Sequence, residues 1–187
     1  MLTTAFERLD ATTREHSLQV SRYSAIVAQT MGVHPAQVSS ITLAAKFHEI
    51  GKLAVPETIL NKPAKLTAEE QAMLREYPLR GYEMLRQEQS LMEAAEIVYC
   101  HRENFDGTGY PRRLKGESIP LGARIVAIAD TFAMFVSDRP HRPEHTINAA
   151  RNQVCRWSGN YFDPGVVKSF ASVPDRIWQS ARVAHMR

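Results

Sequence analysis

The chain lacks the cysteines of a disulfide scaffold and the long apolar runs of a membrane protein. Only Cys100 and Cys155 are cysteines among its 187 residues, and they form no CxxC pair, so both are expected to be reduced and buried. No apolar run approaches the roughly 18–20 residues of a membrane span. Charged residues from Glu7 onward interrupt the N-terminus before a signal-peptide core could form. These absences predict a cytoplasmic protein.

An excess of charge of one sign is also missing. Lysine and arginine number 23 against 20 aspartates and glutamates, so the formal net charge is only +3. Without a dense basic block, binding to a nucleic-acid polymer is disfavoured, and a solvated surface of mixed charge is the simpler interpretation. The balance still suits a small anionic ligand.

Helical periodicity runs through nearly the whole chain, and no convincing strand alternation is present. One apolar stripe at helical spacing is formed by Val20, Tyr23, Val27 and Met31. Gly32 is expected to end that helix and Pro35 to open the next. The apolar segment 121–137 is long enough to favour a buried helix over a strand. The pattern predicts an all-α domain.

Turn and cap signals divide the chain further. The patterns Thr67–Glu70 and Ser90–Glu93 each predict a helix start of the capping-box type. Residues 104–120 are rich in glycine and proline and predict a long structured loop, the kind of segment that often carries function. Asp163 followed by Pro164 predicts another helix start, and residues 174–187 predict a terminal amphipathic helix.

Four polar residues sit where apolar side chains are expected: His16, His48, His101 and Asp130. Each lies in, or at the end of, an apolar helical stripe, where an unpaired carboxylate would be costly to bury. For any one of them, a private hydrogen-bond partner is the simpler explanation. Four together, with Glu49 beside His48, favour a shared cation. The other histidines lie outside such stripes and are expected at the surface.

The order of motifs resembles an HD-GYP domain, a branch of the metal-dependent HD phosphohydrolases associated with bacterial cyclic di-GMP signalling. The matching segments are HSLQV (16–20), FHEIGKLAVPETILNKPAKLTAEE (47–70), PLRGYEML (78–85), HRENFDGTGYP (101–111), LKGESIPLGARIVAIAD (114–130), SDRPHR (137–142) and YFDPGVV (161–167). The resemblance implies an all-helical HD-domain bundle of about seven to eight helices with a long GYP loop. That domain would span residues 1–172, with 173–187 as a C-terminal helix or tail.

The resemblance also implies a chemistry. Family members hold two or three metal ions that assist the cleavage of cyclic di-GMP or a related cyclic dinucleotide. The implied metal ligands are His16, His48, Glu49, His101 and Asp130. Lys52 matches the catalytic lysine that faces the phosphate, and the matching substrate-binding residues are Tyr110, Arg139 and Arg142. GYP-type domains are further associated with binding to GGDEF-domain proteins, which makes such a protein the expected partner.

Departures from the family pattern concentrate on the metals. Glu49 replaces a bridging aspartate, and Thr12, Tyr77 and Arg102 stand where the family has metal ligands. A neutral phenol, with an ordinary pKa near ~10, is a poor ligand, and an arginine offers only hydrogen-bond donors. We therefore expect one divalent transition metal, Fe or Mn in preference to Zn or Ni, and no second metal. Arg102 is expected to replace the second cation and to pair with Glu49.

Two functions stay open on the sequence. In the first, the domain is catalytically impaired and acts by binding cyclic di-GMP or a partner protein. In the alternative, it is an active cyclic di-GMP phosphodiesterase with an altered, mononuclear site. A weaker third hypothesis keeps the site for another phosphate ester, against which the intact GYP loop argues.

Overall fold

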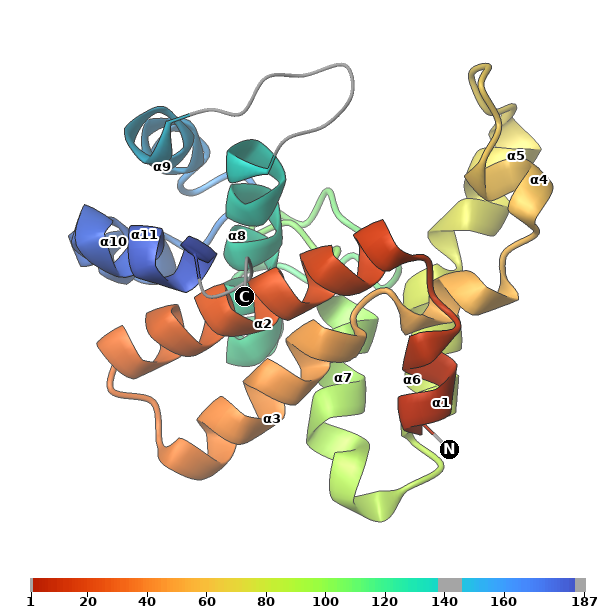
Figure 1. Cartoon of the computed structure of the whole chain (residues 1–187), viewed down its shortest axis with the longest axis horizontal. Helices are drawn as coiled ribbons and strands as arrows, with labels where there is room; N and C mark the ends of the chain where they lie inside the picture. The colour runs from red at the N-terminus through yellow and green to blue at the C-terminus, as the bar shows by residue number, and fades with distance from the viewer. Residues whose placement is uncertain (1, 138–145, 184–187) are drawn as a thin grey trace.

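The computed structural model describes residues 2–137 and 146–183, and it shows a bundle of helices (Figure 1). Arg139 and Arg142, two predicted substrate-binding residues, lie outside the described residues. Over these two ranges, none of the helices has both the length and the apolar character that a bilayer crossing requires. The β-structure in the same ranges is one isolated bridge between Ser158 and Phe162. The prediction of an all-α fold is confirmed.

The larger helices are α2 (Ala11–Thr30), α3 (Pro35–Phe47), α6 (Tyr77–Leu85), α7 (Met92–Cys100), α8 (Leu121–Val136), α9 (Ile147–Arg156), α10 (Pro164–Ser172) and α11 (Asp175–Val183). Shorter pieces are α1 (Leu2–Glu7), α4 (Glu57–Leu60) and α5 (Ala68–Arg75), with 3₁₀ turns η1 (Ile50–Ala54), η2 (Gln89–Leu91) and η3 (Gly116–Ser118). The short pieces divide the described chain more finely than the expected seven to eight helices.

Most predicted helix ends are confirmed by their caps. Gly32 follows the end of α2 with a φ of 72°, a left-handed conformation that glycine adopts at little cost. Pro35 opens α3, and Thr67 forms the capping box of α5 with Glu70. The second capping box is wrong: Ser90 lies within η2, and α7 begins at Met92 without a side-chain cap.

The core forms around α2 and α8, which cross near the centre of Figure 1. Helix α2 packs mainly against α3 and α8, and α10 and α11 also contact it. Trp178 of α11 is fully buried, with its ring 5.4 Å from that of Tyr23, 4.9 Å from Phe132 and 5.3 Å from Phe170. The predicted terminal helix is therefore present and contributes an aromatic side chain to the core.

A close backbone approach places η1 on α6. A Cβ atom added at Gly51 would lie 1.9 Å from the carbonyl oxygen of Tyr77 and 2.5 Å from the amide nitrogen of Gly81. Only a glycine permits this contact, because both neighbours are backbone atoms. The contact brings the histidine and glutamate at 48 and 49 beside the first turn of α6, where Tyr77 lies.

Candidate metal centre and ligand pocket

Three potential ligand atoms come together from α2 and the segment that follows α3. One atom each of His16, His48 and Glu49 lies within 4.8 Å of the other two. His48 is fully buried and Glu49 is 5% exposed, so this group, the His48 cluster, is shielded from bulk water. The structure thus brings together three of the five predicted metal ligands as a group able to hold one cation.

The orientation of His48 fits a metal ligand. Its Nδ1 donates a hydrogen bond to the carbonyl oxygen of Ala45 at 2.7 Å, which leaves Nε2 with its lone pair. Burial lowers the pKa of His48, so the imidazole stays neutral. Nε2 is buried and has no hydrogen-bond partner among the described residues. A neutral imidazole held through its other nitrogen, with a free lone pair, is the form that binds a metal.

Glu49 and Lys52 form an ion pair at the edge of this cluster. Burial by itself would raise the pKa of Glu49, but the charge and the hydrogen bond of the Lys52 ammonium oppose that effect, and the pKa is lowered. Glu49 is therefore ionised and able to ligate a cation. Lys52, which the resemblance places against a phosphate, is instead engaged with a carboxylate in this structure, and its catalytic role stays a prediction.

A second set of polar side chains lies beside the first and is fully paired. The Tyr77 hydroxyl donates to Nε2 of His101 at 2.9 Å and accepts a hydrogen bond from Nε of Arg102. Nη1 of Arg102 lies 2.9 Å from Oδ2 of Asp130. We call Tyr77, His101, Arg102 and Asp130 the Arg102 network. The expected pairing of Arg102 with Glu49 is wrong, because the guanidinium reaches across to α8 while Lys52 pairs with Glu49.

Protonation states in the Arg102 network follow from burial and from the guanidinium. Burial, with a further contribution from Arg102, holds the pKa of His101 well below its usual range. Burial would raise the pKa of Asp130, but the Arg102 charge and the His16 hydrogen bond outweigh it and hold that pKa well below its usual range. Burial raises the pKa of Tyr77. The network therefore contains a neutral imidazole, a carboxylate, a guanidinium and a protonated phenol.

The side chains of the His48 cluster fit one metal ion, and those of the Arg102 network are hydrogen-bonded or ion-paired with one another. At the first site, the free Nε2 of His48 and the ionised Glu49 are suitable ligands, and Nε2 of His16 is hydrogen-bonded to Oδ1 of Asp130 at 2.7 Å. At the second, His101 already accepts a hydrogen bond through Nε2, and the guanidinium of Arg102 has no lone pair to offer. Thr12, one turn before His16 on α2, is exposed.

Asp130 connects the Arg102 network to the His48 cluster. Its Oδ1 is 2.7 Å from Nε2 of His16 and 3.8 Å from Nε2 of His48, while Oδ2 is held by Arg102. The carboxylate is 1% exposed, so these partners rather than water neutralise it. Its role as a metal ligand, like that of His101, stays a prediction.

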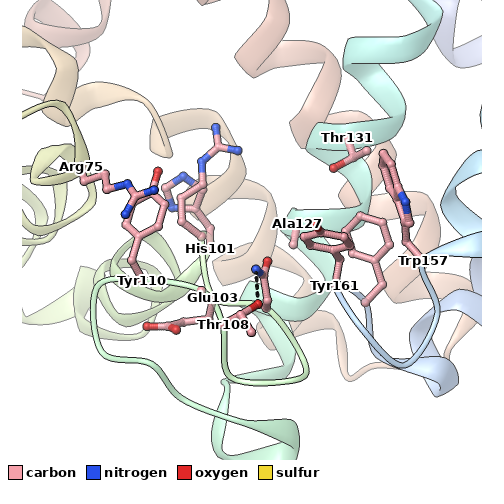
Figure 2. A pocket seen from close by; sticks show the side chains of 13 residues that line it. Arg75, His101, Glu103, Thr108, Tyr110, Ala127, Thr131, Trp157 and Tyr161 are labelled. Atoms are coloured by element: carbon pink, nitrogen blue, oxygen red, sulfur yellow. Dashed lines mark hydrogen bonds between the residues drawn. The ribbon is translucent and has the colours of Figure 1, made fainter. Parts of the chain in front are cut away.

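A pocket of about 410 Å³ opens beside the Arg102 network (Figure 2). Tyr110 and Arg75 lie on one side of it, with the guanidinium carbon of Arg75 5.3 Å from the centre of the Tyr110 ring. Trp157 and Tyr161 lie on the other side, and His101 lies between the two (Figure 2). The sequence indicated Tyr110 but not Arg75, Trp157 or Tyr161, because no local spacing connects these segments.

Glu103 holds the loop that carries Tyr110. Its carboxylate accepts backbone hydrogen bonds from Arg112 at 2.7 Å and Leu114 at 3.1 Å, and the residue is only 3% exposed. The loop also folds back closely: a Cβ at Gly109 would lie 2.2 Å from the amide nitrogen of Asn104. Sequence reasoning missed Glu103, although an acid between the histidine and the glycines of this motif was a usable signal.

The comparisons with known proteins identify the family of this chain. A family model described as HD domain matches residues 2–166. The cyclic di-GMP phosphodiesterase response regulator RpfG of Xanthomonas campestris is 39% identical over 89% of this chain and 44% of its own length. A cyclic di-GMP phosphodiesterase of Thermotoga maritima is 36% identical over 91% of this chain and 47% of its own length. The chain thus spans less than half the length of these relatives.

Solved structures share the fold. A cyclic GMP-AMP specific phosphodiesterase of V. cholerae, V-cGAP3, superposes with a TM-score of 0.69 at 19% identity over 97% of this chain and 51% of its own. The HD domain of the L. monocytogenes phosphodiesterase PgpH, in complex with cyclic-di-AMP, gives 0.69 at 15% identity over 100% of this chain and 97% of its own. From the family model, the relatives and the motifs together, this chain belongs to the HD domain family, in its HD-GYP branch.

Proposed function

We propose that this chain is an HD-GYP unit that binds cyclic di-GMP or a related cyclic dinucleotide and hydrolyses it weakly or not at all. The observation that carries the proposal is the Arg102 network. In it the Tyr77 phenol is hydrogen-bonded to His101 and the Arg102 guanidinium is paired with Asp130, and these are two groups that a second cation would need as ligands. Two-metal cleavage depends on a pair of cations that stabilise the attacking and leaving oxygens. A fixed guanidinium supplies charge but no open coordination position.

The same guanidinium supports binding. Arg102 pairs with Asp130 and also lines the pocket beside Tyr110, as does Arg75, so the pocket wall offers guanidinium groups to an anionic ligand. Guanidinium groups bind phosphate oxygens through charge-assisted hydrogen bonds in fixed geometry. Hence a cyclic dinucleotide, with two phosphates and two aromatic bases, is the ligand class that this pocket suits.

One divalent transition metal is proposed at the His48 cluster, Fe or Mn in preference to Zn or Ni. His16, His48 and Glu49 would hold it, and it would supply Lewis-acid activation of a phosphate oxygen. Lys52 keeps Glu49 ionised and oriented, and burial keeps His48 neutral. The enclosure of His48 and Glu49 also limits the access of bulk water.

The alternative is an active cyclic di-GMP phosphodiesterase with one metal. It is favoured by the free Nε2 of His48 and by the relatives named as cyclic di-GMP phosphodiesterases, at 36–39% identity. In that case the retained cluster would suffice for hydrolysis, and Arg102 would stabilise charge that develops on the phosphate. A GGDEF-domain protein as partner is proposed on the family resemblance alone, and action in the cytoplasm is proposed on the lack of a long apolar run in the sequence.

Turnover and metal content together distinguish the two functions. Purified protein with Mn²⁺ or Fe²⁺ is expected to bind cyclic di-GMP, to hold about one metal per chain and to turn over below roughly 1 per second. The double variant Tyr77→His with Arg102→His removes the phenol and the guanidinium. It is expected to bind a second metal and to gain at least about tenfold in rate.

The matched control is Tyr82→His with Arg86→His. Tyr82 lies on α6 and Arg86 directly follows it, and the guanidinium carbon of Arg86 is 5.3 Å from the centre of the Tyr82 ring. This control adds the same two histidines away from the site and is expected to change neither quantity. Wild-type turnover at 1 per second or above, abolished by His48→Ala, would establish the alternative.

A further inference from the structure

The pocket has two aromatic walls, of which only Tyr110 has an expected role. Tyr161 on the opposite wall is 48% exposed, and its ring centre is 5.5 Å from that of Trp157. Trp157 in turn packs against the buried rings of Phe135, at 5.8 Å, and Phe162, at 6.1 Å. The wall is therefore anchored in the core behind and open on the pocket side, as a surface for stacking requires.

Backbone hydrogen bonds join the two walls into one unit. The amide of Phe105 donates to the carbonyl of Tyr161 at 3.1 Å, and the amide of Asp106 donates to that of Asn160 at 2.8 Å. On the other side, the amide of Tyr110 donates to the carbonyl of Arg102 at 3.1 Å. The spacing between the walls is thus fixed before a ligand arrives, which reduces the ordering cost of binding.

The groups between the walls suit the middle of a dinucleotide. Figure 2 shows Tyr110 and the pair Trp157 and Tyr161 on opposite sides, and Arg102 also lines the pocket. Two stacking surfaces that flank a guanidinium match two bases that flank phosphates. A single mononucleotide would use only one of the walls.

We propose that Trp157 and Tyr161 form a second base-stacking platform, so that the pocket holds both bases of a cyclic dinucleotide. This inference rests on the proposed function and assigns a binding role to the turn that carries the motif YFDPG. Stacking on aromatic side chains tolerates any base, so this platform sets affinity for a two-base ligand rather than the choice of base.

Calorimetric titration of the full chain with cyclic di-GMP tests the proposal. Tyr161→Ala and Trp157→Ala are each expected to weaken binding about tenfold or more, whereas Tyr161→Phe, which keeps the ring, stays within about threefold of wild type. The control Tyr82→Ala removes a tyrosine that stacks on Tyr99 at 5.0 Å outside this pocket, and it is expected to bind normally. Thermal melts verify that each variant is folded.

Fluorescence adds a readout that a structural role would not move. Trp157 is half-buried at the pocket and Trp178 is fully buried in the core, so a ligand-induced change in tryptophan emission is assigned to Trp157. The change is expected in the wild type and absent in Trp157→Phe, which retains affinity. The one-base probe 5′-GMP is expected to bind at least about 100-fold more weakly than cyclic di-GMP.

The outcomes separate the two proposals. Normal affinity in Tyr161→Ala and Trp157→Ala, with weakened binding in Tyr110→Ala, would overturn the second platform and leave the proposed function intact. Equal affinity for 5′-GMP and cyclic di-GMP would overturn the two-base pocket. Failure of the folded wild type to bind cyclic di-GMP would overturn both.

Discussion

His48 and His101 are two buried histidines that make the same local hydrogen bond through Nδ1 but face different groups through Nε2. Each donates through Nδ1 to the carbonyl three residues earlier, Ala45 or Val98, and burial keeps each neutral. They differ in what faces Nε2: no described group bonds to that of His48, while the Tyr77 hydroxyl bonds to that of His101. The two histidines therefore differ in the partner that a neighbouring helix supplies to Nε2 and not in their own orientation.

The substitution Gly51→Ala should break the contact on which both sites depend. Its methyl group would collide with backbone atoms of Tyr77 and Gly81, which cannot move aside as a side chain can. We expect a loss of at least about 4 kcal/mol in unfolding free energy, measured by urea denaturation, or a failure to fold. Gly116→Ala is a control, since its added methyl would meet no atom within 4 Å, although its φ of 58° adds modest strain. Wild-type stability in Gly51→Ala would contradict the close packing of η1 on α6.

Removal of the Arg102 guanidinium should lower the stability of the protein, because this group pairs with both Asp130 and Tyr77. In Arg102→Ala, the Tyr77 hydroxyl loses the donor from which it accepts a hydrogen bond, and Oδ2 of Asp130 loses its cationic partner while Asp130 stays buried. Because removing one partner of a buried pair leaves an uncompensated charge, we expect a loss of about 3 kcal/mol in unfolding free energy. The control Arg80→Ala removes exposed pairs with Glu76 and Glu83 and should cost under about 1 kcal/mol. Equal effects of the two changes would contradict this account.

Histidine truncation should separate the two sites by metal content. His48→Ala removes a nitrogen with a free lone pair and is expected to weaken metal binding by at least about 100-fold, measured by elemental analysis after dialysis. His101→Ala removes a nitrogen already bonded to Tyr77, so the same measurement should change by less than about tenfold. The reverse order would show that the second set of residues holds the metal.

Acid should destabilise the metal-free protein through these same two histidines. Their pKa values are lower in the folded state than in the unfolded chain, where histidine titrates near ~6.5. The unfolded state thus binds more protons below that pH, and stability falls as the pH drops. Between pH 6.5 and 5.5 we expect a loss of about 2 kcal/mol by urea denaturation in EDTA, reduced by half in His101→Gln. A flat profile would show that neither histidine is buried in its neutral form.

Local sequence signals predicted the parts of the fold that depend on a few neighbouring residues. Gly32, Pro35 and the Thr67 capping box set helix ends through contacts within about four residues. The prediction of a second capping box was wrong for two reasons. Ser90 lies inside the η2 turn instead of at a helix N-cap, and the carboxylate of Glu93 accepts a hydrogen bond from the hydroxyl of Ser40 on α3. A long-range contact decided that segment.

The sequence by itself determined the all-α class through its apolar periodicity and the family through the order of its motifs. It also indicated a set of metal ligands, namely His16, His48, Glu49, His101 and Asp130. Only the tertiary structure decided that Arg102 pairs with Asp130 rather than Glu49, and that Tyr161 faces the pocket that holds Tyr110. The physical reason is that a side chain's partner across two helices depends on how those helices pack. In this chain that packing is set by contacts between residues far apart in sequence, such as the close approach of Gly51 in η1 to the backbone of α6.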